Sequence, residues 1–121
     1  MEIVEHNIQN KNIAEIISDE IIINTAEDAL DLLGNMYYQG YEVILIYEKN
    51  LCSDFFDLKS GLAGEILQKF SNYRMRLFVI GDFQKFTSTS LKDFIYESNK
   101  GKQVNFVAQL SDALQALSNT K

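Results

Sequence analysis

The sequence predicts an α/β domain with a mixed, mostly parallel sheet of five strands, an N-terminal β-hairpin and four helices. Short runs rich in Val, Ile and Leu alternate with longer segments whose apolar residues recur every three or four positions. Such alternation is typical of parallel strands joined by right-handed helical crossovers. The 121 residues contain no proline and no Gly/Ser-rich linker. We therefore expect a single domain spanning residues 1–121.

The predicted hairpin comes first in the chain. Glu2–Gln9 places Ile and Val among polar residues, Asn10–Asn12 interrupts the pattern, and Ile13–Ser18 is apolar again. Two β-prone runs around a turn of this kind favour a hairpin, because Asn tolerates the left-handed backbone that tight turns need. The hairpin would give the sheet an antiparallel edge, and an exposed edge strand would permit pairing with a second copy of the chain.

Apolar spacing and capping residues predict four helices, at Thr25–Gly40, Ser60–Arg74, Ser90–Lys100 and Ser111–Leu117. Thr25 with Asp28, and Ser90 with Asp93, have or approach the spacing of a capping box, and Ser111 is placed to cap the last helix. The remaining strands are predicted at Tyr41–Tyr47, Arg76–Gly81 and Gln103–Ala108. The first two of these are apolar runs, as expected for strands buried on both faces.

The charge balance bears on the partners of the domain. The chain has 17 acidic and 11 basic residues, a net charge of −6, and no basic run longer than two. Nucleic acid and anionic membranes are therefore not expected as partners. No apolar stretch approaches the roughly 20 residues that span a bilayer, and the N-terminal residues do not have the pattern of a secretory signal. With Cys52 as its single cysteine, the domain is expected in the reducing cytoplasm.

One candidate site is Ser60, which starts the predicted second helix as Ser60-Gly61-Leu62. A helix N-terminus presents unpaired backbone N–H groups and a partial positive charge. These groups suit a capping hydroxyl, and they would equally stabilise a phosphate on that hydroxyl. Lys59 could help to hold the added charge. Ser60 is therefore either a helix cap alone or a phosphorylation site.

Four acidic residues in the loops after the strands form a second candidate site: Glu48, Asp54, Asp57 and Asp82. Two of them, Glu48 and Asp82, follow strands that we expect to be neighbours, so their carboxylates could converge. Converging carboxylates could bind a hard cation such as Mg²⁺ or exchange protons with a substrate. Alternatively, they cap turns on the wet rim of the sheet. No nucleophile–base pair is visible, so no catalytic residue and no cofactor are predicted.

The same loops carry four aromatic residues: Phe55, Phe56, Phe83 and Phe86. At least one of each pair is expected to close the end of the core, and any that are exposed would form an apolar patch for a protein partner. The single histidine, His6, lies on the predicted hairpin and is expected to be exposed or hydrogen-bonded there.

Three stretches of the chain resemble an uncharacterised bacterial family catalogued as domain of unknown function 4180: FFDLKSGLAGEILQKFSNYR, VIGDF and SLKDFIYESNKG. This resemblance implies membership of the family and brings no established activity with it.

The whole chain also resembles, more distantly, the STAS domains of anti-sigma-factor antagonists. The similar stretches are ISDEIIINTAEDALDLL, FDLKSGLAGEILQKF followed by RLFVIGD, and SLKDFIYESNKGKQVNFVAQLSDALQAL. In that family the phosphorylated Ser or Thr precedes Gly-Leu at a helix start, so the resemblance implies phosphorylation at Ser60. The family's Asp-Ser before this position is replaced by Leu58-Lys59, with Asp57 one residue further out, and the preceding loop is longer.

These observations favour a non-enzymatic module that binds a protein partner and is switched by a phosphate on Ser60. The alternative is a small-molecule or metal site at the strand ends, lined by Glu48, Asp57, Asp82 and the loop aromatics; an enzyme using these acids ranks last. The residues expected to contact a partner or ligand are Lys59, Asp57, Phe55, Phe56, Asp82 and Phe83.

Overall fold

The computed structural model describes residues 1–119. Its strands are β1 (Glu2–Ile8), β2 (Lys11–Ile17), β3 (Val43–Tyr47), β4 (Arg76–Ile80) and β5 (Val104–Val107). Its helices are α1 (Ala26–Tyr38), α2 (Leu62–Asn72), α3 (Thr89–Lys100) and α4 (Leu110–Ser118). Between β3 and α2 lie three short 3-10 turns, η1 (Glu48–Asn50), η2 (Ser53–Phe56) and η3 (Leu58–Ser60).

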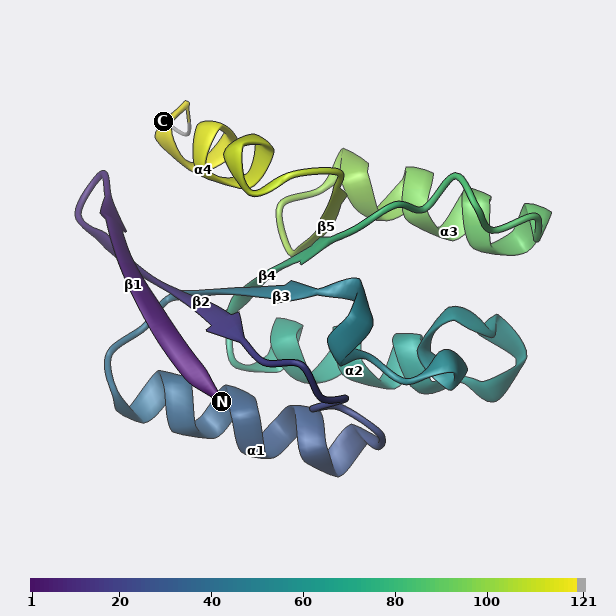
Figure 1. Ribbon diagram of the computed structural model, residues 1–121, viewed down its shortest axis with the longest axis horizontal. Coiled ribbons are helices and arrows are strands. Elements are labelled where there is room, and N and C mark those ends of the chain that lie inside the picture. The colour runs from purple at the N-terminus through teal and green to yellow at the C-terminus, as the bar shows by residue number, and fades with distance from the viewer. Residues whose placement is uncertain (120–121) are drawn as a thin grey trace.

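The five strands form one sheet in the order β1-β2-β3-β4-β5 (Figure 1). The β1–β2 pair is antiparallel and the other three pairs are parallel, which confirms the predicted fold class. The hairpin turn uses Gln9 and Asn10, both with positive φ (55° and 64°). Positive φ at both central residues matches the right-handed twist of the paired strands, and Asn adopts it at low cost.

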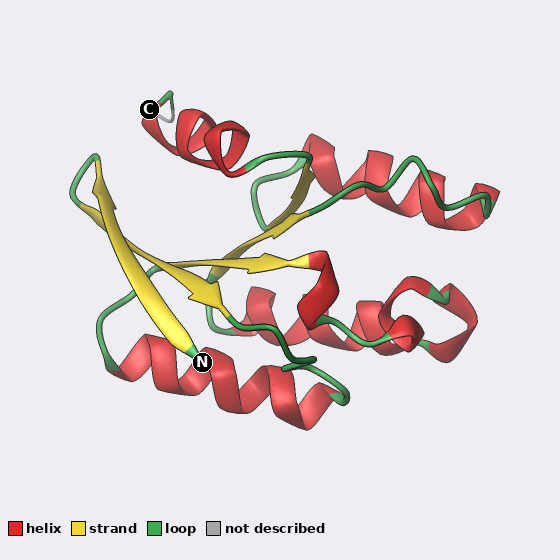
Figure 2. Ribbon diagram, viewed as in Figure 1, coloured by secondary structure: helices red, strands yellow, loops and turns green. Residues whose placement is uncertain are grey.

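Helices cover the two faces of the sheet unequally. The larger core lies between one face and the helices α1, α2 and α3. On the opposite face, the helix that packs among residues 1–119 is α4, through Ala113 and Leu117. Figure 2 shows α1 and α2 along one side of the strands and α4 on the other. No helix in the described part of the chain has both the length and the apolar character needed to cross a membrane.

Two of the predicted helix caps are wrong and one is confirmed. Thr25 and Asp28 form the capping box of α1, with Asp28 N–H donating to Thr25 Oγ1 at 3.1 Å. The cap of α3 is Ser88 rather than Ser90, since Ser88 Oγ accepts from Leu91 N–H. Four consecutive hydroxyl residues precede Leu91, so capping preference alone does not choose among them. The cap of α4 is Gln109 rather than Ser111.

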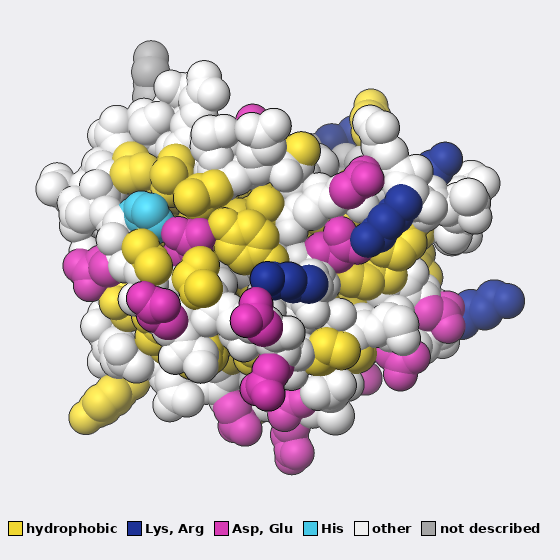
Figure 3. Space-filling view, viewed as in Figure 1, with side chains coloured by type: hydrophobic (Ala, Val, Ile, Leu, Met, Phe, Trp, Pro, Cys, Tyr) yellow, Lys and Arg dark blue, Asp and Glu magenta, His cyan; other side chains and the backbone are white. Residues whose placement is uncertain are grey.

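A buried carboxylate lies on the face that α4 leaves partly open. Glu15 is only 5% exposed, and its two oxygens contact His6 Nε2 at 2.9 Å and Tyr47 Oη at 2.7 Å. The prediction that His6 is a hydrogen-bonded edge residue is confirmed. Figure 3 shows the histidine among hydrophobic side chains on the front of the molecule. Burial, and then the hydrogen bond to Glu15, raise the pKa of Tyr47 to about 12.

This arrangement predicts a pH dependence of stability. The neutral Tyr47 phenol donates to Glu15, so its contribution is complete below the ordinary pKa of 10.0 and is lost as the pH rises towards about 12. In urea unfolding between those two pH values, wild type should lose stability more steeply than Tyr47→Phe. Tyr37→Phe removes a hydroxyl from an exposed ring and should parallel wild type. Parallel curves for wild type and Tyr47→Phe would contradict this assignment.

Candidate functional site

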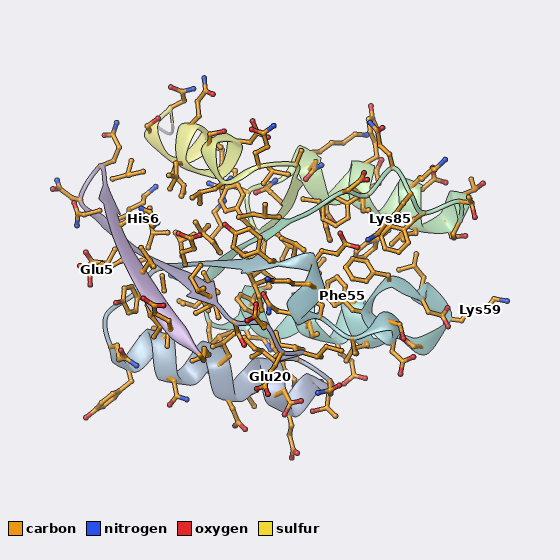
Figure 4. The ribbon with its side chains drawn as sticks, in the orientation of Figure 1. Glu5, His6, Glu20, Phe55, Lys59 and Lys85 are labelled. Atoms are coloured by element: carbon orange, nitrogen blue, oxygen red, sulfur yellow. The ribbon has the colours of Figure 1, made fainter. Side chains whose placement is uncertain are left out.

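The segment from β3 to α2 positions the predicted site residues in a chain of tight turns. Asp57 caps the start of η3, and its Oδ1 accepts from Lys59 N–H at 3.1 Å. The turn ends at Gly61, whose φ of 78° is left-handed and favours glycine. Figure 4 shows Lys59 pointing away from the body of the molecule, while Phe55 lies against its interior.

The prediction that the second helix begins at Ser60 is wrong by two residues. Ser60 ends η3, and α2 begins at Leu62, because the left-handed Gly61 separates the two elements. The hydroxyl still reaches the helix: Ser60 Oγ accepts from Leu62 N–H at 3.2 Å. The N-cap residue of α2 is therefore Gly61 and not Ser60, although the Ser60 hydroxyl still accepts from the first N–H of the helix. The Ser60 side chain is exposed.

The same hydroxyl holds the loop together. Ser60 Oγ lies 2.6 Å from the carbonyl oxygen of Asp54 and 2.8 Å from that of Asp57. Both contacts need the single hydroxyl proton, which the two carbonyl oxygens share. This one hydroxyl consequently links η2, η3 and the first turn of α2.

A groove of about 410 Å³ opens beside this hydroxyl. Its walls come from the N-terminal ends of α1 and α2 and from η2: Asn24, Thr25, Ala26, Glu27, Asp54, Ser60, Leu62 and Glu65. Three of these residues, Glu27, Asp54 and Glu65, carry carboxylates, and none of the described lining residues is a Lys or Arg. The groove thus combines a negative rim with a hydroxyl and two helix N-termini.

The predicted acidic constellation is divided among local contacts. Glu48 Oε1 accepts from the backbone N–H of Asp82 at 3.2 Å, and the Glu48 carboxylate also pairs with the Lys85 ammonium. Asp82 Oδ1 accepts from the N–H of Gln84, two residues further along the chain. Asp57 makes the same kind of local contact with Lys59 N–H. Within residues 1–119, no group of three or more His, Cys, Asp or Glu residues is placed to hold a metal ion.

The contact between Glu48 and the end of β4 depends on a glycine. A Cβ built on Gly81 would lie 2.5 Å from Cβ and 2.6 Å from Oε1 of Glu48. Any larger residue there would displace the glutamate. The sequence interpretation therefore correctly brought Glu48 and Asp82 near one another, but they meet through backbone and not as paired carboxylates.

The loop aromatics pack against each other and the sheet. Phe55 is 1% exposed, and Phe56 stacks on Phe86 with ring centroids 4.9 Å apart. Phe83 meets the buried ring of Phe106 edge-on at 5.3 Å. The prediction that one of each pair closes the core is confirmed for Phe55, while the other three rings are partly buried. The large apolar side chains that are exposed lie elsewhere: Met1, Val4, Ile17, Ile21, Tyr37, Tyr38, Tyr73 and Tyr96.

Sequence analysis did not single out three polar residues that the structure shows to be partly or fully buried. They are Glu15, Asn50 and Arg76. The first and last were detectable in principle, because a charged side chain inside or at the start of an apolar strand needs a partner on that face. Asn50 gave no such pattern, since an asparagine in a polar loop is ordinary.

Comparison with known families places the chain. The family model described as Domain of unknown function (DUF4180) matches residues 8–117, nearly the whole chain. The chain belongs to this family. The DUF4180 match extends from the end of β1 into α4, and so it includes the Ser60 loop and the groove. No curated protein matches the chain.

Proposed function

We propose that this domain is a non-enzymatic regulatory module that binds a protein partner in the groove beside Ser60, and that phosphorylation of Ser60 releases the partner. The observation that carries the proposal is the position of the Ser60 hydroxyl, which belongs to an exposed residue lining the groove and is bonded to three backbone groups. A kinase could reach it, and its modification would change the loop. The resemblance to the phosphoacceptor helix of STAS domains supports the same position.

A phosphate on Ser60 would act through charge and lost hydrogen bonds. Esterification removes the hydroxyl proton, so the carbonyl oxygens of Asp54 and Asp57 would face a group of charge about −1.5 to −2. The carboxylates of Glu27 and Glu65, on the walls of the groove, would add to the repulsion. The helix N-terminus would offset part of this cost. We expect η3 to open and the groove to change shape.

The charge of the groove indicates the chemistry of the partner. Three carboxylates without a lining cation favour a segment that carries Lys or Arg, because opposite potentials steer association and set specificity. The remainder of the chain, at a net charge of −6, would reinforce this preference. A phosphate on Ser60 would add negative charge to the groove, so release of the partner depends on the opened η3 turn no longer fitting it.

The role of the hydroxyl can be measured without the partner. Ser60→Ala should lower the free energy of unfolding by about 1 kcal/mol, the usual net value of such hydrogen bonds. Ser60→Asp should lower it further, since a carboxylate would face two carbonyl oxygens. Ser53→Ala removes an exposed hydroxyl from the same loop and should change stability by less than about 0.5 kcal/mol. Equal effects of the three substitutions would show that Ser60 does not hold the loop.

The regulatory role needs protein from native cells. Peptide mapping should find phosphate on Ser60, and a pull-down should recover one partner with wild type but about tenfold less with Ser60→Asp. Ser60→Ala loses the hydroxyl without gaining a charge, so its recovery of the partner should fall between the two. Glu65→Gln should weaken the same interaction, whereas Glu2→Gln, at an exposed residue that does not line the groove, should not. If Ser60 is never modified and all variants recover the partner equally, the proposal fails.

A ligand site at the strand ends is a second candidate, because a pocket of about 410 Å³ lies there. Asp82, Phe83 and Phe106 line it, whereas Glu48 and Asp57 do not. Thermal melts with Mg²⁺, Mn²⁺ and a metabolite panel test this candidate, and a flat response throughout would exclude it.

A further inference from the structure

A third cavity, a pocket of about 420 Å³, lies at the opposite end of the parallel strands from the Ser60 loop. It is bounded by the start of β4, the connection from α3 to β5, and the last turn of α4. Figure 1 shows that connection passing next to α4. Phe78, Phe106 and Val107 supply apolar surface, and Arg76 and Lys102 supply charge.

Arg76 contacts an aromatic ring and an amide in this pocket and uses only part of its hydrogen-bonding capacity. Its guanidinium carbon lies 4.6 Å from the centre of the Phe78 ring. Its Nε and Nη2 donate to Asn105 Oδ1 at 3.3 and 2.8 Å. Asn105 is itself 8% exposed and is fixed through Nδ2 to the carbonyl of Gly101 at 3.0 Å. Among residues 1–119, no carboxylate lies within ion-pair distance of Arg76.

The arginine therefore has unused capacity for a ligand. A guanidinium has five N–H donors, and two of them are used by Asn105. Burial lowers the pKa of the Arg76 guanidinium, as expected for a charge that has lost water without gaining an anion. Its plane is set by Phe78 and Asn105, which suits two-point contact with an oxyanion.

The charges around the pocket have one sign. The described lining residues include Arg76, Lys100 and Lys102 but no Asp or Glu, in a chain where acids outnumber bases 17 to 11. Lys100 is already paired with Glu97 at 3.0 Å. Lys102 is exposed, and it has no ion pair within the described residues. A concentration of positive charge against the overall balance attracts anions.

We propose that this pocket binds a small anionic molecule whose phosphate or carboxylate group is held by Arg76 and Lys102. The guanidinium and the ammonium bind the oxyanion, and Phe106 and Val107 contact the carbon skeleton. The site is separate from the acidic groove beside Ser60 and would work independently of it.

The experiment titrates the full chain with inorganic phosphate, citrate and neutral glycerol, and follows backbone amides by NMR. Phosphate or citrate should shift the amides of Gly101, Lys102 and Asn105 saturably, and glycerol should not. The stronger of the two anions identifies the ligand class. Lys102→Gln should weaken binding by about three- to tenfold, and Arg76→Gln by more than about tenfold. Lys92→Gln removes the same charge from an exposed site on α3 and should leave binding unchanged.

Three results would overturn the proposal: no saturable shift with either anion up to about 10 mM; shifts spread evenly over all lysines; or equal losses for Lys102→Gln and Lys92→Gln. If Arg76→Gln does not fold, the comparison of the two lysine variants decides the question, because both residues are exposed.

Discussion

Phe55→Ala should lower the free energy of unfolding by about 3–5 kcal/mol, the usual cost of removing a buried aromatic ring. Phe55 is 1% exposed and touches two other rings, with centroid distances of 5.0 Å to Phe56 and 6.3 Å to Phe106. Its removal would leave a cavity between the η2 turn and β5. Chemical denaturation with urea measures the change.

The matched control is Phe86→Ala. The Phe86 ring is partly buried and stacks on Phe56, with Lys85 Nζ 5.5 Å from its centre. Because it lies at the outer side of the cluster, its removal should cost about 1–2 kcal/mol. Equal losses for the two variants would mean that Phe55 is not the centre of the cluster.

Asn50→Ala should lower the free energy of unfolding by about 2–4 kcal/mol, because two backbone carbonyl groups would lose their buried donor and the side chain would leave a cavity. The fully buried Asn50 donates through Nδ2 to the carbonyl oxygens of Ser18 and Glu20, at 2.9 and 2.8 Å. The backbone carbonyl of Asn50 accepts from the N–H groups of Ile22 and Ile23. This side chain thus ties the connection after β2 to the end of β3.

One further variant separates the effect of the Nδ2 donors from the effect of side-chain volume, and a second serves as an exposed control. Asn50→Asp keeps the shape but removes the donors and adds a buried charge, so it should cost more than Asn50→Ala. Asn35→Ala changes an exposed residue of α1 and should alter stability by less than about 0.5 kcal/mol. Near-wild-type stability of Asn50→Asp would contradict the role of the Nδ2 group.

The fold was predictable because the local pattern of apolar residues identifies most of its helices and strands. Apolar runs such as Val43–Tyr47 can be satisfied only as buried strands, and the apolar stripe of α1 repeats with helical period. Thr25 was predictable as a cap because Asp28 stands at the reciprocal position. The start of α3 was not, because several hydroxyl residues offer equivalent caps.

The candidate site was predictable in position but not in geometry. Ser60 contacts two backbone carbonyls and a backbone N–H. Because these groups are the same in nearly every residue, the sequence does not show which of them Ser60 will contact. The left-handed backbone at Gly61 was equally hidden, since glycine also occurs inside helices. Glu48 and Asp82 were placed together from strand order, but the direction of each carboxylate depends on turns that the sequence pattern does not specify.

The order of strands across the sheet has a consequence for how the molecule assembles. Every strand pairs with the one that follows it in the chain, so no strand must be inserted between two that are already paired. Each crossover then closes a loop of modest length onto an existing edge, which keeps the entropic cost of each addition low. The sheet can therefore form strand by strand, from the hairpin towards β5, in the order in which the strands are synthesised.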